Sequence, residues 1–105
     1  MKAYRSMDSI PWSPHPTAKG VKIKPMISKK EHGLDLTCIL VQIPMGEEIP
    51  EHIHETQDDI VYPLQGKGVM WVDGDGEFSL EPGLIVRVPK GTKHKIFNIS
   101  EDLLI

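Results

Sequence analysis

The sequence has a single cysteine and no long apolar segment among its 105 residues. One cysteine cannot form an internal disulfide, which fits a reducing compartment. No apolar run approaches the roughly 18–20 residues that a membrane span needs. The first residues carry charges, but no continuous apolar stretch follows them, so a signal peptide is not expected. These absences predict a cytoplasmic protein without a membrane partner.

The chain also lacks the excess of basic residues that nucleic-acid-binding proteins usually carry. It has 12 basic and 15 acidic residues, which gives a formal net charge of −3. Its most basic segment contains Lys22, Lys24, Lys29 and Lys30, and we interpret these side chains as the solvated face of a strand and a turn. No nucleic-acid partner is therefore expected.

Helical periodicity is absent as well, since no segment sustains apolar residues at a spacing of three or four. Instead, short runs typical of β-strands alternate with turn signals after residue 20. These runs cover residues 21–27, 36–43, 60–64, 69–72, 78–80, 84–88, 95–99 and 103–105. They predict one all-β domain, a sandwich or a barrel, over residues 21–105. Residues 1–20 are rich in proline and are expected to form an irregular N-terminal arm.

Three histidines indicate the chemistry of the chain. His52 and His54 are two residues apart, a spacing that places both imidazoles on the same face of a strand. Two such rings can meet one metal ion at about 2.0–2.2 Å from each nitrogen. Asp58 and Asp59 follow closely with carboxylate oxygens, and His94 comes after a turn in a distant strand. An isolated His-x-His pair more often lies at the surface without binding a metal, but this pair is one part of a larger pattern.

Two longer spacing patterns contain these residues. The first runs Gly46, five residues, His52, one residue, His54, four residues, Asp59, six residues, Gly66. The second runs Gly83, five residues, Pro89, one residue, Gly91, two residues, His94, three residues, Asn98. Together they resemble the two signature motifs of the cupin superfamily. The second pattern matches at every defined position, and the first departs only at Asp59, where the family normally has glutamate.

The resemblance implies a double-stranded β-helix, or jelly-roll barrel, that binds one divalent metal ion near one mouth. It assigns the metal-ligand positions to His52, His54, Asp59 and His94. Three imidazoles and a carboxylate suit iron, manganese, nickel, zinc and copper alike, so the ion is not specified. The motif glycines would occupy tight turns. Asn98 shares parity with His94 in its expected strand and would point inward.

The aspartate at position 59 leaves the fourth ligand open. Aspartate is shorter than glutamate by one methylene, about 1.5 Å of reach. Asp59 could bind the ion directly if its strand shifts inward, could bind through a water molecule, or could leave a site of three histidines. Asp58 is the competing ligand, and Gln57 is a weaker one. Pro63, which cannot donate to a ladder, suggests an edge or a bulge that would supply the inward shift.

Two classes of function are compatible with such a site. An open metal position would support an enzyme that acts on a small molecule, and the resemblance to cupins implies a dioxygenase-like reaction or, with zinc, a sugar-phosphate isomerase-like one. The alternative is a non-catalytic module that binds or senses a metal or a small molecule. The resemblance also implies a homodimer, because cupins commonly pair through their sheets and exchanged N-terminal strands.

Several remaining residues have simpler interpretations. His15 and His32 lie outside the motifs and are expected at the surface. Cys38 lies in an apolar run and is interpreted as a buried, unreactive residue. Arg87, together with Lys90 and Lys93, could reach an anionic substrate at the barrel mouth, but the preferred interpretation is that these side chains face solvent.

Overall fold

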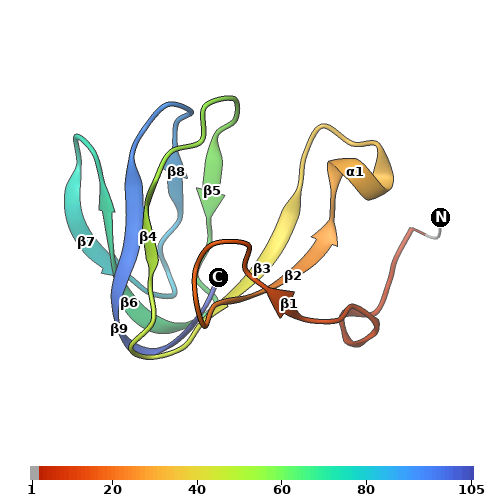
Figure 1. The fold of residues 1–105 in the computed structure, drawn as a ribbon, viewed down its shortest axis with the longest axis horizontal. Coiled ribbons are helices and arrows are strands. Elements are labelled where there is room, and N and C mark those ends of the chain that lie inside the picture. Colours follow the sequence, from red (N-terminus) through yellow and green to blue (C-terminus); the bar gives the residue numbers. More distant parts are fainter. Residues whose placement is uncertain (1–2) are drawn as a thin grey trace.

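The computed structural model describes residues 3–105, and β-strands dominate this part of the chain (Figure 1). Two short helical turns are η1 (Met7–Ser9) and α1 (Lys29–His32). The strands are β1 (Ser13–Pro14), β2 (Lys22–Ile27), β3 (Cys38–Ile43), β4 (Ile49–His52), β5 (Asp59–Val61), β6 (Gln65–Val72), β7 (Gly76–Leu80), β8 (Val86–Val88) and β9 (His94–Leu104). No helix among residues 3–105 is long and apolar enough to cross a membrane.

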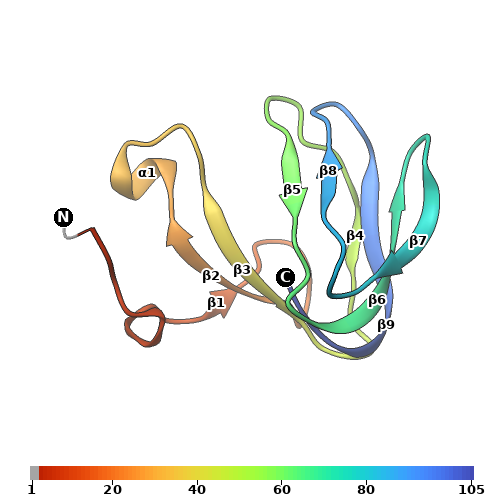
Figure 2. The ribbon, with the colours of Figure 1, turned by 180° about the vertical axis from the view of Figure 1, so that it is seen from behind.

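The strands form two antiparallel sheets that enclose one core. The larger sheet has the order β1-β2-β3-β9-β6-β7, and β4 pairs with β9 beside this path. The smaller sheet consists of β5 and β8. The β2–β3 hairpin, which carries α1, projects to one side of the other strands in both views (Figures 1 and 2). The predicted all-β, single-domain jelly-roll fold is confirmed.

The core follows from the alternation of apolar residues along the strands. In β6, Gly68, Met70 and Val72 are buried while the residues between them are only partly covered or exposed. In β8, Val86 and Val88 are buried on either side of the exposed Arg87. A period of two places these side chains on the inner face of each sheet, where their burial supplies the main stabilisation of the fold.

The face of β9 that points into the core changes halfway along the strand, and this change shows that one prediction was wrong. His94 and Ile96 are buried, but farther along Ile99 and Leu103 face the core instead. Between them, Asn98 has a left-handed backbone with φ of 49°, and the register of β9 against β6 shifts in this region. A bulge of this kind turns the following side chains over. Asn98 is therefore exposed rather than pointing inward.

The one-turn helix α1 was not predicted, because four residues are too few to show a helical period. It depends on its caps instead. The side-chain oxygen of Ser28 accepts a hydrogen bond from the Glu31 N–H, and Gly33 ends the turn in a left-handed conformation. The side chain of His32 is largely buried, and its Nδ1 accepts the Ser28 N–H at 3.1 Å. The prediction that His32 lies at the surface was wrong, and half-buried His15 also accepts backbone N–H groups.

Two burial predictions in the β2–β3 hairpin were also wrong. Cys38 is exposed, because this end of β3 pairs with β2 alone and only Gln42 and Ile43 pair with β9. Lys24 is only 8% exposed, because the N-terminal arm covers it. Its Nζ donates a hydrogen bond to the Met7 carbonyl at 3.0 Å and lies 4.9 Å from the centre of the Trp12 ring.

Four motif glycines, Gly46, Gly66, Gly83 and Gly91, adopt a positive φ. Gly46, Gly83 and Gly91 lie in turns, as predicted, whereas Gly66 lies inside β6 beside a shift in its register with β9, so the turn predicted there is wrong. Gly66 is the most constrained of them, because a Cβ atom there would overlap the backbone carbonyl of Asp102. The close approach of β6 to the far end of β9 therefore depends on the absence of a side chain at position 66.

Candidate metal centre

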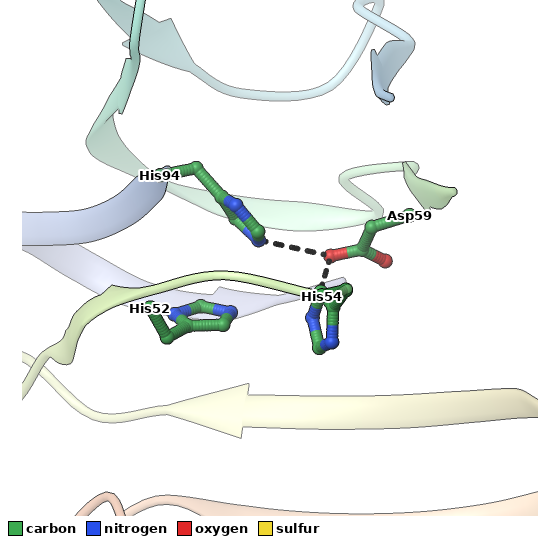
Figure 3. A group of neighbouring side chains, drawn as sticks. All are labelled: His52, His54, Asp59 and His94. Atoms are coloured by element: carbon green, nitrogen blue, oxygen red, sulfur yellow. Dashed lines mark ion pairs between the residues drawn. The ribbon is translucent and has the colours of Figure 1, made fainter. Parts of the chain in front are cut away.

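Four side chains from three segments of the chain converge (Figure 3). They are those of His52, His54, Asp59 and His94, and one ligand atom from each lies within 4.8 Å of the others. His52 ends β4, His54 follows it, Asp59 begins β5 and His94 begins β9. The structure thus brings together all four residues that the sequence assigned to the metal site.

Backbone pairing explains why these side chains meet. His52 and His94 are direct partners in the β4–β9 ladder, and their ring centres are 4.1 Å apart. Asp59 pairs with Val88 in the β5–β8 ladder. His54 lies beyond the end of β4, but its carbonyl accepts the Gly91 N–H at 2.7 Å. Each functional side chain therefore has a backbone that neighbouring segments fix in place.

Hydrogen bonds orient two of the imidazole rings. Nδ1 of His52 lies 2.8 Å from the Pro50 carbonyl oxygen, and Nδ1 of His94 lies 2.9 Å from the Thr92 carbonyl oxygen. A carbonyl can only accept, so Nδ1–H donates in each neutral ring and Nε2 keeps its lone pair. This tautomer is the one in which Nε2 can bind a metal while Nδ1 is held by the protein.

The Nε2 atom of His94 provides the strongest indication of a missing partner. His94 is 1% exposed, and among residues 3–105 its Nε2 is the one fully buried side-chain nitrogen or oxygen atom without a hydrogen bond. The nearest carboxylate oxygen, Oδ2 of Asp59, lies 3.4 Å away, which is too long for a strong hydrogen bond. Buried polar atoms are normally satisfied, and a cation bound by these donors would satisfy this one. The residues therefore fit a metal ion.

The charges at the site also favour a cation. Interaction with the His94 ring, which outweighs the opposing effect of burial, lowers the pKa of Asp59 and keeps its carboxylate ionised. Burial lowers the pKa of His52 and favours its neutral form. Burial alone would also lower the pKa of His94, but Asp59 and the Thr92 carbonyl together raise it. At neutral pH the site offers one negative oxygen and imidazole nitrogens, the donor set of many transition-metal sites.

Asp58, the competing carboxylate, faces a different set of partners. Its Oδ1 accepts the Lys90 N–H at 2.9 Å, and its Oδ2 accepts Nε–H of Arg87 at 3.0 Å. These bonds, together with the charge of Arg87, lower the pKa of Asp58. Gln57 is exposed. Asp59 is thus the carboxylate that joins the three histidines. No local pattern indicated the contacts of Asp58, since they join residues that are 29 and 32 positions apart.

One side of the group is open to solvent. The side chains of His54 and Asp59 are each 36% exposed, whereas that of His94 is 1% exposed. An ion held by four protein ligands can take a fifth and a sixth ligand. A small molecule could therefore reach the ion from the side of His54 and Asp59, while the opposite side is closed by the core.

Comparisons with known proteins agree with this fold. The family model of the Cupin domain matches residues 39–105. An uncharacterised protein of Methanocaldococcus jannaschii is 36% identical over 58 residues, which cover 55% of this chain and 46% of that protein. Quercetin 2,3-dioxygenase of Bacillus subtilis is 41% identical over 51 residues, which cover 49% of this chain and 15% of the enzyme. The matched segments therefore span less than half the length of either relative.

A solved structure resembles almost the whole chain. It is that of a Thermotoga maritima protein described as a predicted oxalate decarboxylase. The two chains superpose with a TM-score of 0.80 and 23% sequence identity, over 94% of this chain and 90% of the other. Identity at this level supports the fold alone. The arrangement of strands found here is thus one that an experimentally determined protein also adopts.

Proposed function

Because this chain belongs to the cupin family, we propose that it binds one divalent transition-metal ion through His52, His54, Asp59 and His94. The observation that carries this proposal is the buried Nε2 of His94, which has no hydrogen-bond partner and faces an ionised carboxylate. A cation at this point would satisfy the nitrogen and balance the charge of Asp59.

We further propose that the metal-loaded protein is an enzyme that acts on a small molecule. A bound ion with open coordination positions supplies Lewis acidity or, for a redox-active metal, oxidative chemistry. The residues of the chain would hold the ligand set rigidly through the Pro50 and Thr92 carbonyls and exclude water behind His94. Of the two reaction classes that the motifs imply, the similarity to quercetin 2,3-dioxygenase supports the dioxygenase-like class over the isomerase-like one.

Metal analysis followed by oxygen-consumption assays tests this proposal. The protein is freed of metal and reloaded separately with iron, manganese, nickel, zinc or copper. Each form is then assayed with quercetin, simple phenols, diketones and small organic acids. We expect stoichiometric metal and oxygen uptake in at least one redox-active form, and neither in His94→Ala. Tight binding of a small molecule without turnover in any form would instead favour the non-catalytic module.

We also propose that the protein is a homodimer, with the outer face of the β5–β8 sheet as the contact. Ile60 is 66% exposed, Ile85 is 69% exposed, and Tyr62 and Leu84 add further apolar surface nearby. Exposed apolar patches of this kind mark association sites. Light scattering should give twice the chain mass at micromolar concentration, and Ile60→Glu should reduce it to the mass of one chain. A monomeric wild-type protein would contradict this proposal.

The proposed compartment is the cytoplasm. Cys38 is an exposed free thiol, and such thiols persist in a reducing environment.

A further inference from the structure

Asp58 forms a compact anchor at the rim of the metal group. One carboxylate oxygen, Oδ1, accepts the backbone N–H of Lys90 at 2.9 Å. The other, Oδ2, accepts Nε–H of Arg87 at 3.0 Å and lies 2.9 Å from Nη2 of the same guanidinium. Asp58 thus contacts both a side chain and the backbone of one short segment, residues 87–90. Charge-assisted contacts of this kind are stronger than neutral ones and fix the direction of approach.

The anchor joins the two segments that carry the metal group. Residues 54–59 hold His54 and Asp59, and residues 87–91 lead from β8 toward His94 at the start of β9. Backbone contacts also tie these segments together. They are the Gly91 N–H bond to the His54 carbonyl and the β5–β8 ladder, in which Asp59 pairs with Val88 and Ile60 with Arg87. The Asp58 anchor adds a side-chain contact with residues 87–90 at the end of this short ladder where Asp59 lies.

A short ligand at position 59 makes the placement of Asp59 relative to His94 critical. Aspartate reaches about 1.5 Å less far than glutamate from the same backbone position. Even so, Oδ2 of Asp59 lies 3.4 Å from Nε2 of His94 and 3.7 Å from Nε2 of His54. The start of β5 must therefore lie close to the histidines.

We infer that Asp58 is a positioning residue, whose contacts with Arg87 and Lys90 hold the start of β5 where the short side chain of Asp59 reaches the metal ion. The inference rests on the proposed metal site. Asp58 touches neither the ion nor a substrate in this account. It acts through the backbone that it shares with Asp59.

Cobalt binding tests the inference without any assay of activity. The probe is Co²⁺ alone, and both its dissociation constant and its visible absorption spectrum are measured. We expect Asp58→Ala to weaken Co²⁺ binding about tenfold, the scale seen for residues that orient metal ligands, and to change the spectrum. Arg87→Ala removes the other half of the anchor from an exposed position, so it should have the same effect even if Asp58→Ala does not fold.

Asp102→Ala is the matched control. Asp102 also accepts a backbone N–H, that of Met45 at 2.8 Å, but it lies near the opposite end of β9 from His94. This variant should bind Co²⁺ with wild-type affinity and spectrum. An equal loss in Asp102→Ala and Asp58→Ala would overturn the inference, because the loss would then reflect a general loosening of the fold.

A longer ligand separates positioning from general stability. In an Asp59→Glu background, the extra methylene supplies the reach that the anchor otherwise secures. We expect Asp58→Ala to weaken Co²⁺ binding by less than about threefold in that background, since the two positions are coupled. A tenfold loss in both backgrounds, or wild-type affinity and spectrum in the Asp58→Ala single variant, would overturn the inference. Absence of Co²⁺ binding by the wild-type protein would refute the proposed metal site itself.

Discussion

The metal end of the barrel and the projecting β2–β3 hairpin place polar and apolar groups in opposite ways. At the metal end, a histidine is buried beside a carboxylate, and both are fixed by pairing between strands that are distant in sequence. In the hairpin, apolar Leu36 and Ile39 are exposed while charged Lys24 is buried. The difference lies in what covers each region. Burial is decided by segments far away in the chain, not by the hydrophobicity of the residue alone.

Substitutions along β3 should show this contrast most strongly. Ile43 is 0% exposed where β3 pairs with β9, whereas Ile39 is 40% exposed in the projecting hairpin. Replacing each by alanine removes the same atoms. Ile43→Ala should lower the free energy of unfolding by about 2–5 kcal/mol, and Ile39→Ala by less than about 1 kcal/mol. Urea unfolding measures both, and equal losses would show that the hairpin is covered in solution.

Two glycines sharpen the contrast between covered and open backbone. Both Gly66 and Gly74 have a positive φ, but a Cβ atom meets the Asp102 backbone only at position 66 and open space at position 74. Gly74→Ala should lower stability by about 1 kcal/mol, the cost of the left-handed conformation. Gly66→Ala should lower it by about 3 kcal/mol, because strands must also separate. Thermal unfolding of the two variants would contradict this account if their losses were the same.

Acidification should release a metal ion from the site formed by His52, His54, Asp59 and His94. The raised pKa of His94 means that protons compete for its Nε2 as the pH falls toward the ordinary imidazole value of 6.5, so the metal should be released at about pH 6 or below. Asp59→Asn removes the charge that raises the pKa of His94. The decline of metal affinity with acid should therefore begin at a lower pH in the variant than in the wild-type protein. At pH 8, where His94 is neutral in both proteins, the variant should bind metal about tenfold more weakly, because it lacks the carboxylate ligand. Metal titrations from pH 5 to pH 8 measure both effects, and an unshifted pH profile would contradict them.

The metal-free protein should show the complementary dependence. A raised pKa stabilises the fold below the ordinary imidazole value of 6.5 and loses this contribution as the pH rises through the His94 pKa. A lowered pKa stabilises it above the ordinary carboxyl value of 3.8 and loses this contribution as the pH falls through the Asp59 pKa. Unfolding of the metal-free chain by urea should therefore show the Asp59–His94 contribution between about pH 4 and pH 6.5. Asp59→Asn should remove this contribution.

The two longer patterns that resemble the cupin motifs pointed to the four side chains that the structure brings together. The spacing of His52 and His54 alone was not enough, because His54 lies beyond the end of β4 and the period of a strand does not explain its direction. The glycines that adopt a positive φ could also be identified from the sequence, because this conformation depends on the type of a single residue. Most of the strands followed from short apolar runs, but β1 and β4 were not among those runs, and residues 95–99 and 103–105 turned out to be one bulged strand, β9.

Burial by segments that are distant in the sequence could not be predicted from the sequence alone. The bulge at Asn98 depends on how β9 meets β6, and it reversed the inferred direction of that side chain. Lys24 is buried by Trp12 from the arm, and Cys38 is exposed because β9 pairs only with the far end of β3. The contacts of Asp58 with residues 87–90 are of the same kind. In each case the environment of the side chain depends on a segment that is distant in the sequence, and no local pattern indicates that contact.

The most direct measurement of the central claim is a side-chain ¹⁵N NMR spectrum of the histidines before and after one equivalent of Zn²⁺. We predict that the Nε2 resonances of His52, His54 and His94 shift together, while the resonances of His15 and His32 stay unchanged. Unchanged spectra, or a shift confined to His15 or His32, would contradict it.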